Sequence, residues 1–433
     1  MRDPEESLSP EALGELIDGK LAQLVAIATE RSPFYRERFA GLTVRGRADL
    51  PHVPVLDKDS FMAASPPRGE ATLTGPLSGA YVFRSGGSSG EPKFSVFSVE
   101  EFRRFVHFFM RAYTAAGLEA SDRVGNLFAA GSLYASFVFV NRFLEELGVL
   151  NFPFSTTASA EVVADHVRLF GINTLVGFPS WLLQVAERLA AEGLKIEKVF
   201  YAGEHLYEEE RRFLRERLGC RVIASAGYGA VDTGLMGYQC EAATGSVHHV
   251  LADHVYLEIV DPETFAPLPD GEEGLILVTN LDRTRQPVIR YNIGDLGRMV
   301  PGACPCGRTS PRFELRRRGD DVLRIGYANV TYDEVSAAFA RFPELTATVQ
   351  MVKEREERRD KLGFRIEVRE LERLDRASLS GRLTEALAEA KPDIGKLLAS
   401  GYIHPIGFEF LPPGGIPRLP VTGKFKRTLD LSQ

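Results

Sequence analysis

The chain has 433 residues, of which 44% are hydrophobic and 26% are charged, an ordinary composition for a globular protein of two or three domains. Its formal net charge of −7 gives no electrostatic reason to expect binding to nucleic acid. The N-terminus has no signal-peptide pattern, and the most apolar stretch, residues 127–140, is too short and too polar at its edges to span a bilayer. We therefore expect a cytoplasmic protein without a membrane partner.

The first part of the chain alternates between helices and short apolar strands. An amphipathic helix is expected over residues 11–30, and a second helix over residues 102–116. From residue 174 the alternation is regular, and strand–helix–strand repetition at this spacing predicts a mostly parallel sheet with helices on both faces. The predicted strands are 174–178, 198–202 and 221–225, and the helices between them are 181–192 and 208–217.

Further along the chain the pattern changes. Strands 255–260 and 275–279 are separated by the turn sequence 270–274 and by no long helix, which predicts a small antiparallel sheet or barrel. Beyond the highly charged segment 316–321 we expect a compact α+β unit, with a solvated hairpin at 354–361. Its predicted elements are helix 332–340, strands 347–352 and 364–368, and helix 377–390.

Together these elements predict an α/β fold with two domains. The large N-terminal domain, residues 1–318, is expected to contain parallel and mixed sheets with helices, and a small β subdomain. The small α+β C-terminal domain, residues 319–433, is expected to be mobile relative to it.

A loop rich in serine and glycine is the clearest chemical signal in the sequence. It reads Ser85-Gly86-Gly87-Ser88-Ser89-Gly90-Glu91-Pro92-Lys93 and follows an expected strand. Glycines let the backbone wrap closely around phosphate oxygens, and serine hydroxyls add hydrogen-bond donors. The spacing is not that of the GTPase P-loop, and a flexible surface loop is the alternative interpretation of this stretch alone.

The loop resembles the signature Ser/Thr-Ser-Gly-Ser/Thr-Thr-Gly-x-Pro-Lys of the adenylate-forming superfamily, which includes acyl-CoA synthetases, peptide-synthetase adenylation domains and luciferase. Within it, the chain is most similar to the phenylacetate–CoA ligase type. Five motifs in the family's order span nearly the whole chain, from Pro33 to Lys424. The resemblance implies ATP-dependent activation of a carboxylic acid to an acyl-adenylate, and then acyl transfer to a thiol.

The resemblance also assigns roles to the residues of the ATP site. Gly203 and Glu204 follow a strand end, where ligands bind in open α/β sheets, and would lie beside adenine. In the motif 228–232, Tyr228 would stack on adenine and Asp232 would hold Mg²⁺ through a hard carboxylate oxygen. The remaining positions assigned to ATP in these motifs are Ser85, Gly86, Gly87, Ser88, Ser89, Gly90, Lys93 and Gly229.

One position of this motif departs from the family. Val231 stands where the family has threonine, and valine cannot donate a hydrogen bond to the α-phosphate. That contact must come from elsewhere, for example from Ser88, Ser89 or backbone amides.

Three further motifs complete the implied site. Residues 290–295 match Arg-Tyr-x-x-Gly-Asp, and the acceptor-only carboxylate of Asp295 suits two ribose hydroxyls. In the junction motif, Arg318 would contact ribose or phosphate and Asp320 would be the hinge, although Arg317 replaces the family's leading glycine. Near the C-terminus, Lys424 would be the catalytic lysine, with Lys426 as the nearby alternative, because lysine is a point charge suited to phosphates.

The resemblance places the acid pocket among aromatic and small residues: Tyr134, Phe137, Phe178 and Ala202. Such a lining suits a flat aromatic acid, although aromatic residues at this spacing also fit a plain core.

The acceptor of the second half-reaction stays open. Where CoA ligases have a glycine that lets the pantetheine arm pass, this chain has Tyr327, preceded by Gly326. CoA, an acyl carrier protein and a non-thiol acceptor are all compatible with this sequence. A non-catalytic nucleotide-binding scaffold is the alternative of a different class, and homodimers are common among similar proteins.

The cysteines predict a metal site rather than a disulfide scaffold, because four are few for so long a chain. Cys304 and Cys306 form a Cys-x-Cys turn, and Cys240 lies upstream near a histidine pair. Some phenylacetate–CoA ligase-like proteins carry a similar Cys, His, Cys, Cys set, and structural Zn²⁺ takes four such ligands. Alignment favours His249 over His248, whose side chain should point the other way on a strand. Unrelated thiols beside a surface histidine pair are the alternative.

Overall fold

The computed structural model describes residues 3–85, 93–203, 206, 208–318, 322–325, 328–356, 359–418 and 425–431. The chain divides into two compact units, Met1–Arg316 and Arg317–Gln433. The division falls inside strand β14 (Arg312–Arg318), where the charged segment 316–321 begins.

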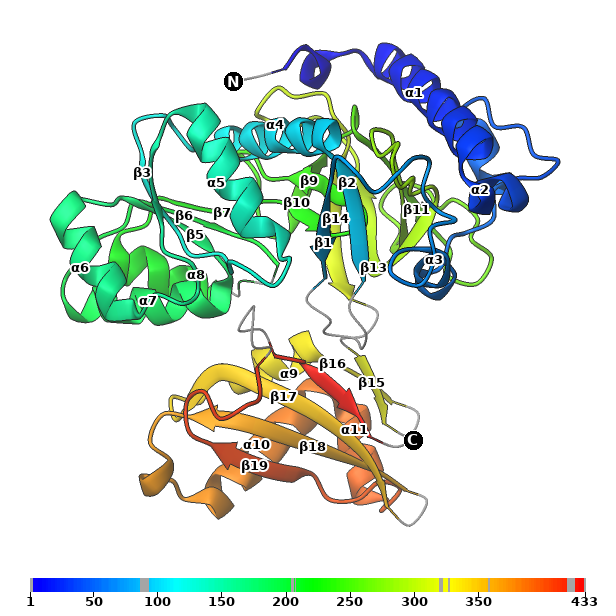
Figure 1. Cartoon of the computed structure of the whole chain (residues 1–433). Coiled ribbons are helices and arrows are strands. Elements are labelled where there is room, and N and C mark those ends of the chain that lie inside the picture. Colours follow the sequence, from blue (N-terminus) through cyan, green and yellow to red (C-terminus); the bar gives the residue numbers. More distant parts are fainter. Residues whose placement is uncertain are drawn as a thin grey trace. The chain divides into compact units, whose positions relative to one another are not determined.

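The first unit opens with a series of helices (Figure 1). The side chain of Ser9 accepts a hydrogen bond from Ala12 N and starts α1, and Ser32 ends α1 and caps the next helix through Tyr35 N. One face of α1 is buried at the three- and four-residue spacing of a helix that covers a core. The elements are the 3₁₀ helix η1 (Pro4–Ser7), α1 (Pro10–Arg31), α2 (Pro33–Arg38), the 3₁₀ helix η2 (Arg47–His52) and α3 (Lys58–Ala64).

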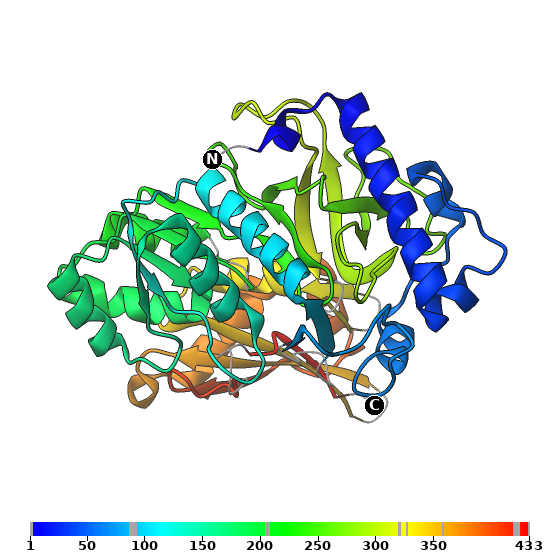
Figure 2. The same cartoon turned by 45° about the horizontal axis from the view of Figure 1, so that its top comes forward.

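A two-stranded antiparallel hairpin follows, made of β1 (Ala80–Arg84) and β2 (Phe94–Ser98). The serine- and glycine-rich loop of the sequence connects these strands. Helix α4 (Val99–Ala115) starts directly after β2 with a capping box between Ser98 and Glu101. It packs against α5 and β9, so that it lies between the two large sheets of the unit (Figure 2).

The predicted parallel sheet is present with five strands in the order β4-β3-β5-β6-β7. Helices cover both faces: α6 and α7 contribute to the core on one face, and on the other Tyr113 of α4 contacts Phe200 of β6 at 5.4 Å between ring centres. The helix expected at 208–217 is α-helical only to Phe213 and continues as a π-helix. The strands are β3 (Arg123–Asn126), β4 (Leu150–Pro153), β5 (Thr174–Gly177), β6 (Lys198–Tyr201) and β7 (Val222–Ser225), and the helices are α5 (Ala135–Leu147), α6 (Ala160–Phe170), α7 (Pro179–Ala191), α8 (Glu208–Phe213) and the π-helix η3 (Leu214–Leu218).

The second large sheet has seven strands in the order β11-β12-β13-β14-β10-β9-β8. Its pairs β11–β12, β12–β13, β10–β14, β9–β10 and β8–β9 are antiparallel, as expected for strands without long intervening helices. Its core is shared with α1, α2, α3 and α4. The strands are β8 (Tyr228–Ala230), β9 (Gly234–Tyr238), β10 (Val247–Val250), β11 (Val255–Val260), β12 (Gly274–Asn280), β13 (Tyr291–Val300) and β14 (Arg312–Arg318).

The second unit is an α+β structure around a long hairpin, as the sequence predicted. Its two strands pair as far as Glu356 and Arg359, inside the charged run, and they belong to a four-stranded sheet of order β19-β18-β17-β20. A two-stranded sheet of β15 and β16 precedes it. The elements are β15 (Val322–Ile325), β16 (Ala328–Thr331), α9 (Tyr332–Phe339), β17 (Leu345–Glu356), β18 (Arg359–Val368), the 3₁₀ helix η4 (Leu371–Arg373), α10 (Arg376–Ala390), α11 (Pro392–Ala399), β19 (Gly407–Leu411) and β20 (Thr428–Asp430).

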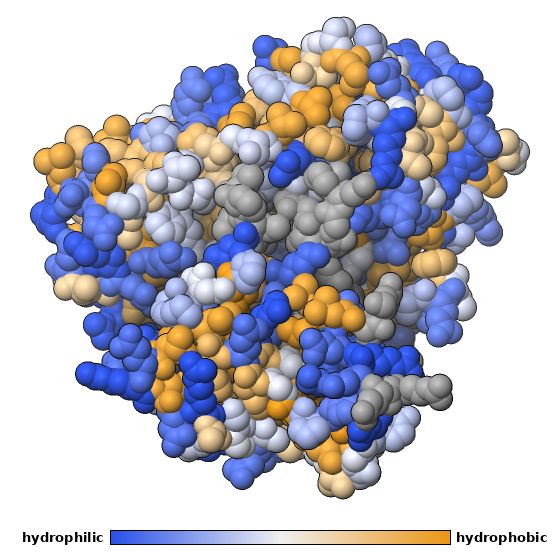
Figure 3. Space-filling view, turned by 60° about the horizontal axis from the view of Figure 1, so that its bottom comes forward, coloured by the Kyte–Doolittle hydropathy of each residue, from blue (hydrophilic) through white to orange (hydrophobic). Residues whose placement is uncertain are grey.

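Among the described residues, no helix is both long enough and apolar enough to cross a bilayer. The face drawn in Figure 3 intermixes hydrophilic and hydrophobic residues. The order of the helices and strands confirms the predicted α/β fold class, with a parallel sheet and a separate antiparallel sheet in the first unit.

Candidate active site

Polar and aromatic residues gather where three parallel strands end. The carboxyl ends of β5, β6 and β7 lie side by side, because these strands are neighbours in the sheet. Ala202 N donates to the carbonyl oxygen of Gly177 at 3.2 Å, and Ala226 N donates to that of Tyr201 at 2.6 Å. These contacts align the segments that lead into Phe178, Gly203 and Tyr228. The crevice beyond such strand ends is the usual ligand site of an open α/β sheet.

Asp232 is the centre of a buried hydrogen-bond network. Its side chain is inaccessible to solvent and accepts a hydrogen bond from Lys93 Nζ. Tyr291 Oη and Ser95 Oγ each donate to it at 3.0 Å, and Lys93 Nζ lies 3.0 Å from Tyr291 Oη. Burial, followed by the charge of Asp232, raises the pKa of Tyr291 above its ordinary value, so that its hydroxyl stays protonated and donates.

The ends of the serine- and glycine-rich loop are held together at its base. Ser85 N donates to Lys93 O at 2.8 Å, and Lys93 N donates to Ser85 Oγ at 2.9 Å. Lys93 therefore connects this loop to Asp232. The other predicted phosphate-binding residues, Gly86, Gly87, Ser88, Ser89 and Gly90, lie outside the described residues.

A second carboxylate is linked to the tyrosine expected to stack on adenine. Tyr228 Oη donates to Asp295 Oδ2 at 2.6 Å, and both residues are buried. The Tyr228 ring also packs on Phe313, with 5.5 Å between ring centres. At Gly229 the backbone approaches Gly234 so closely that a Cβ would lie 2.6 Å from its carbonyl oxygen.

These contacts connect strands that are far apart in the sheet. Tyr291 and Asp295 belong to β13, whereas Tyr228 is in β8 and Asp232 follows it. Three strands, β14, β10 and β9, separate β13 from β8 in the sheet order. Tyr291 of β13 donates to Asp232, and Tyr228 of β8 donates to Asp295 of β13. The sheet therefore curves enough to bring its edge strand β8 back toward β13.

The residues predicted to line the acid pocket lie around the end of β5. The Tyr134 ring meets the Phe178 ring edge-on at 5.6 Å between centres. Ala202 is adjacent through its hydrogen bond to Gly177. Phe137 lies half-buried on the first turn of α5, and its carbonyl oxygen accepts a hydrogen bond from Asn126 Nδ2 at 3.4 Å.

Several predicted site residues fall outside the described part of the chain: Glu204, Asp320, Tyr327 and Lys424. Gly203 is described and adopts a left-handed φ of 80°, a conformation that favours glycine. Arg318 is the last residue of β14, and its side chain is outside the described set.

The structure adds residues to which the sequence analysis gave no role. Ser95 and Tyr291 both donate to Asp232. Ser95 lies two positions after Lys93, and the two-residue period of a strand could have placed both side chains on one face. Arg283 donates to the carbonyl oxygen of Asp232, and no sequence pattern signals such a contact with the main chain.

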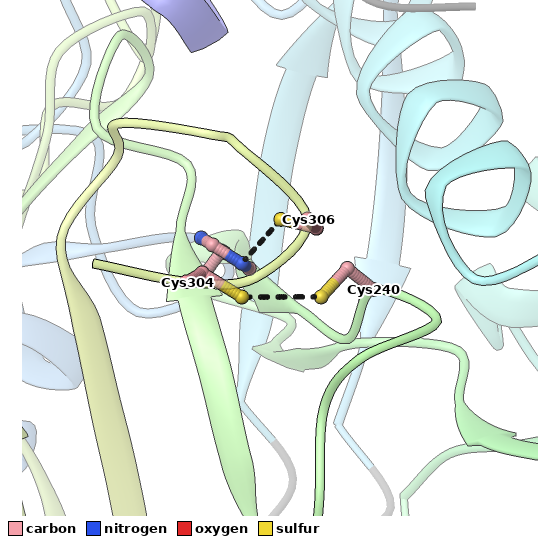
Figure 4. A group of neighbouring side chains, drawn as sticks. Cys240, Cys304 and Cys306 are labelled. Carbon is pink, nitrogen blue, oxygen red and sulfur yellow. Dashed lines mark hydrogen bonds between the residues drawn. The ribbon is translucent and has the colours of Figure 1, made fainter.

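The four predicted metal ligands lie together near the C-terminal end of β10, which carries His249. The ligand atoms of Cys240, His249, Cys304 and Cys306 are all within 4.8 Å of one another. Figure 4 shows the thiols facing a common centre. Cys240 Sγ is 3.7 Å from Cys304 Sγ, close to the ~3.8 Å between two thiolates on one tetrahedral Zn²⁺ and far from a disulfide bond.

The histidine pair is divided between the two faces of β10. His249 Nε2 is 3.4 Å from Cys306 Sγ, and its Nδ1 lies 3.3 Å from both the carbonyl and the hydroxyl oxygen of Ser310. His248 instead contacts the carbonyl oxygen of Ser246 and stacks on Phe313. Burial lowers the pKa of His249 to about 4, so its imidazole is neutral, as a metal ligand must be.

The thiols have unlike surroundings. Burial raises the pKa of Cys240 to about 12. Burial also acts to raise the pKa of Cys306, but hydrogen bonds from the backbone and side chain of Arg308, together with those of Cys304 and Cys240, hold the pKa below its ordinary value. Arg308 Nε in turn donates to the buried carboxylate of Glu6 at 2.7 Å. The N-terminal 3₁₀ helix therefore braces the loop that carries Cys304 and Cys306.

Comparisons with known proteins agree with the motifs. A family model described as AMP-binding enzyme matches residues 36–281, more than half of the chain. The chain is 30% identical to a phenylacetate-coenzyme A ligase of Thermus thermophilus, an alignment that covers 100% of this chain and 99% of the relative. It is 27% identical to a phenylacetate-coenzyme A ligase of Escherichia coli over 85% of each chain.

The fold is also found among solved structures. A crystal structure of 2-hydroxyisobutyryl-CoA ligase in complex with 2-HIB-AMP has a TM-score of 0.79 and 24% identity, and covers 98% of this chain and 91% of that one. Because the family model matches more than half of the chain and the similarity to a relative covers its full length, the chain belongs to the AMP-binding enzyme family, among relatives of the phenylacetate-coenzyme A ligases.

Proposed function

We propose that this protein uses ATP to activate a carboxylic acid as its acyl-adenylate, releases pyrophosphate, and transfers the acyl group to the thiol of coenzyme A. The observation that supports this most directly is the reciprocal pairing of Tyr291 with Asp232 and of Tyr228 with Asp295. It brings two carboxylates from separate family motifs to one side of a curved sheet. The full-length similarity to curated CoA ligases supports the choice of CoA.

In this proposal each described residue has a distinct task. Asp295 accepts hydrogen bonds from the ribose hydroxyls, and Tyr228 presents its ring to adenine. Lys93 carries positive charge at the base of the loop expected to hold the phosphates. Asp232, through its match to the family motif, would hold Mg²⁺ by a hard carboxylate oxygen, and the ion would neutralise phosphate charge.

The chemistry is a displacement at the α-phosphate. A substrate carboxylate oxygen forms a bond to the α-phosphorus while the bond to the pyrophosphate oxygen breaks. Lys424, the lysine matched by the family motif, would stabilise the negative charge that develops there. The thiol sulfur of CoA then attacks the acyl carbon, AMP leaves, and the thiol proton passes to solvent or to AMP.

The acid is proposed to be aromatic. Tyr134 and Phe178 meet edge-on beside Ala202, a small residue, at the end of β5. A rigid aromatic wall with a small residue beside it accommodates a flat ring with little loss of side-chain entropy.

A panel of aromatic and aliphatic carboxylic acids tests this function. Purified protein should catalyse acid-dependent exchange of radiolabelled pyrophosphate into ATP, fastest with aryl or arylacetic acids. Addition of CoA should then yield AMP and a thioester in equal amounts. Exchange without thioester formation would point to another acceptor, a carrier protein or an amine, in keeping with Tyr327 where CoA ligases have glycine. Absence of exchange with every acid would contradict the proposal.

We also propose that Cys240, His249, Cys304 and Cys306 bind a structural Zn²⁺. The support is the geometry of the donor set, whose sulfur separation and neutral imidazole suit a tetrahedral site with no open position. The ion would join the loop after β13 to the loop after β9. Metal analysis of freshly purified protein should find about one zinc per chain, and a result well below that would reject the site.

A further inference from the structure

Arg283 is a charged residue in an unusual environment. Its side chain is completely buried, and among the described residues no carboxylate lies within ion-pair distance of it. Burial lowers its pKa, and the charges of Glu101 and Asp232 act on it only from further away. A buried guanidinium without a paired carboxylate is costly, so its retention calls for a specific task.

The contacts of Arg283 converge on the segments that frame Asp232. One terminal nitrogen, Nη1, donates to the carbonyl oxygen of Asp232 and lies 3.4 Å from that of Val231. The other, Nη2, donates to the carbonyl oxygen of Val96 at 2.9 Å and to Gln286 Oε1 at 3.2 Å. The guanidinium also lies over the Phe97 ring, 4.1 Å from its centre, which fixes its plane.

The contact with Val96 matters because of its neighbour in the chain. Ser95 Oγ donates to Asp232 Oδ1 at 3.0 Å. Gln286 Oε1 also accepts from Val96 N at 2.8 Å, so that both polar groups of the Val96 backbone are held by the segment 283–286. Arg283 thus fixes the main chain of Asp232 and the strand that carries its hydroxyl partner relative to each other.

We propose that Arg283 is a positioning residue that orients the Asp232 carboxylate for the magnesium-bound triphosphate of ATP. This inference rests on the proposed role of Asp232. The planar guanidinium can serve two carbonyl oxygens from two segments at once, which the single ammonium of lysine cannot do with the same geometry. Arg283 itself touches neither phosphate nor metal and acts through Asp232 and Ser95.

The test compares Arg283→Lys and Arg283→Met with the wild-type chain. In pyrophosphate exchange, the KM for MgATP should rise about tenfold in Arg283→Lys and roughly 30-fold or more in Arg283→Met, since hydrogen bonds from a charged group are removed. The KM for the acid should change less than about twofold. A direct binding readout is the increase in Tm on adding MgATP over that with ATP and EDTA, which both variants should lose in large part.

Arg111 offers a matched control, because it is also a buried arginine in the first unit. It pairs with Asp253 at 2.7 Å instead of with the segments around Asp232. Arg111→Lys should lower Tm yet keep the magnesium-dependent shift and the KM for MgATP. If Arg283→Met does not fold, Arg283→Lys decides the test.

Two results would overturn the inference. One is an unchanged magnesium-dependent Tm shift in folded Arg283 variants. The other is an equal rise in the KM for MgATP and for the acid, because this would indicate general loosening of the site. If wild-type protein binds MgATP but exchanges no pyrophosphate, the proposed function fails while the Tm shift still tests Arg283.

Discussion

At the scale of single residues, the candidate site depends on two carboxylates that are each held by a tyrosine from across the sheet. Asp232 receives Tyr291, Ser95 and Lys93, and Asp295 receives Tyr228. Hydrogen bonds to charged groups contribute about 1.5–3 kcal/mol each, roughly twice the contribution of neutral ones. These contacts therefore fix the carboxylates in place before any ligand is present.

Asp295 provides the prediction at this scale. Asp295→Asn keeps the size of the side chain but removes the negative charge that would accept from the ribose hydroxyls. The KM for ATP should rise about 10- to 100-fold, from the loss of charge-assisted hydrogen bonds, while the KM for the acid stays nearly constant. Steady-state pyrophosphate exchange with each substrate varied in turn measures both constants.

Tyr228→Phe is the matched control for this prediction. It keeps the ring that is proposed to stack on adenine and removes only the hydroxyl that donates to Asp295. A loss of up to about tenfold in ATP affinity is expected. If Asp295→Asn raised the KM for the acid as much as that for ATP, Asp295 would not be a specific ribose contact.

At the scale of elements, periodicity predicted three of the five strands of the parallel sheet, β5, β6 and β7, together with the helices between them. These strands and helices follow from apolar runs and helical spacing, which are local patterns, whereas β3, β4 and most strands of the antiparallel sheet were not predicted. The π-helical end of α8 and the bracing role of the N-terminal 3₁₀ helix were not predicted. Glu6 is buried, and its carboxylate accepts from Tyr238 and Arg308, which lie more than 200 residues later in the chain. A local pattern carries no information about such a contact.

The same limit applies to the candidate site. The sequence motifs included Lys93, Asp232, Tyr228 and Asp295. In the structure, Lys93 donates a hydrogen bond to Asp232, and Tyr228 donates one to Asp295. Arg283 was missed because main-chain carbonyl oxygens are acceptors at every residue, so their recognition leaves no trace in the residue types.

The N-terminal 3₁₀ helix leads to the prediction at the scale of elements. Glu6 holds Arg308, and Arg308 holds Cys306, so Glu6→Gln should weaken the support of the proposed zinc loop. Loss of such an outer partner typically reduces metal affinity about 10- to 100-fold. Zinc release into a chromogenic chelator should therefore be faster in Glu6→Gln than in wild-type protein.

Glu5 supplies the control for the Glu6 variant, because it is a half-buried glutamate next to Glu6 in the same 3₁₀ helix. Glu5→Gln should release zinc at the wild-type rate. Equal release rates for Glu6→Gln and wild-type protein would show that the N-terminal 3₁₀ helix does not support the metal loop.

At the scale of the whole molecule, the proposed chemistry uses residues of both units. The described carboxylates and aromatic residues of the site are in the first unit, whereas Lys424 belongs to the second. In the second unit the sheet holds both flanks of segment 419–424. The Glu367 carboxylate accepts from Ile416 N at 3.1 Å and from Arg418, and Gln350 Nε2 donates to the Lys426 carbonyl oxygen at 2.5 Å.

Because Lys424 is proposed to act in adenylation, replacing it allows the two half-reactions to be measured separately. Lys424→Ala should lower acid-dependent pyrophosphate exchange about 100- to 1,000-fold, because a positive group at the developing charge is lost. Thioester formation from purified acyl-adenylate and CoA needs no charge at the α-phosphate of ATP, so it should keep most of its rate. Lys426→Ala is the control, because the contact of Lys426 with Gln350 is made by its backbone and survives the change. Unchanged exchange in Lys424→Ala, or a stronger loss in Lys426→Ala, would transfer the catalytic role away from Lys424.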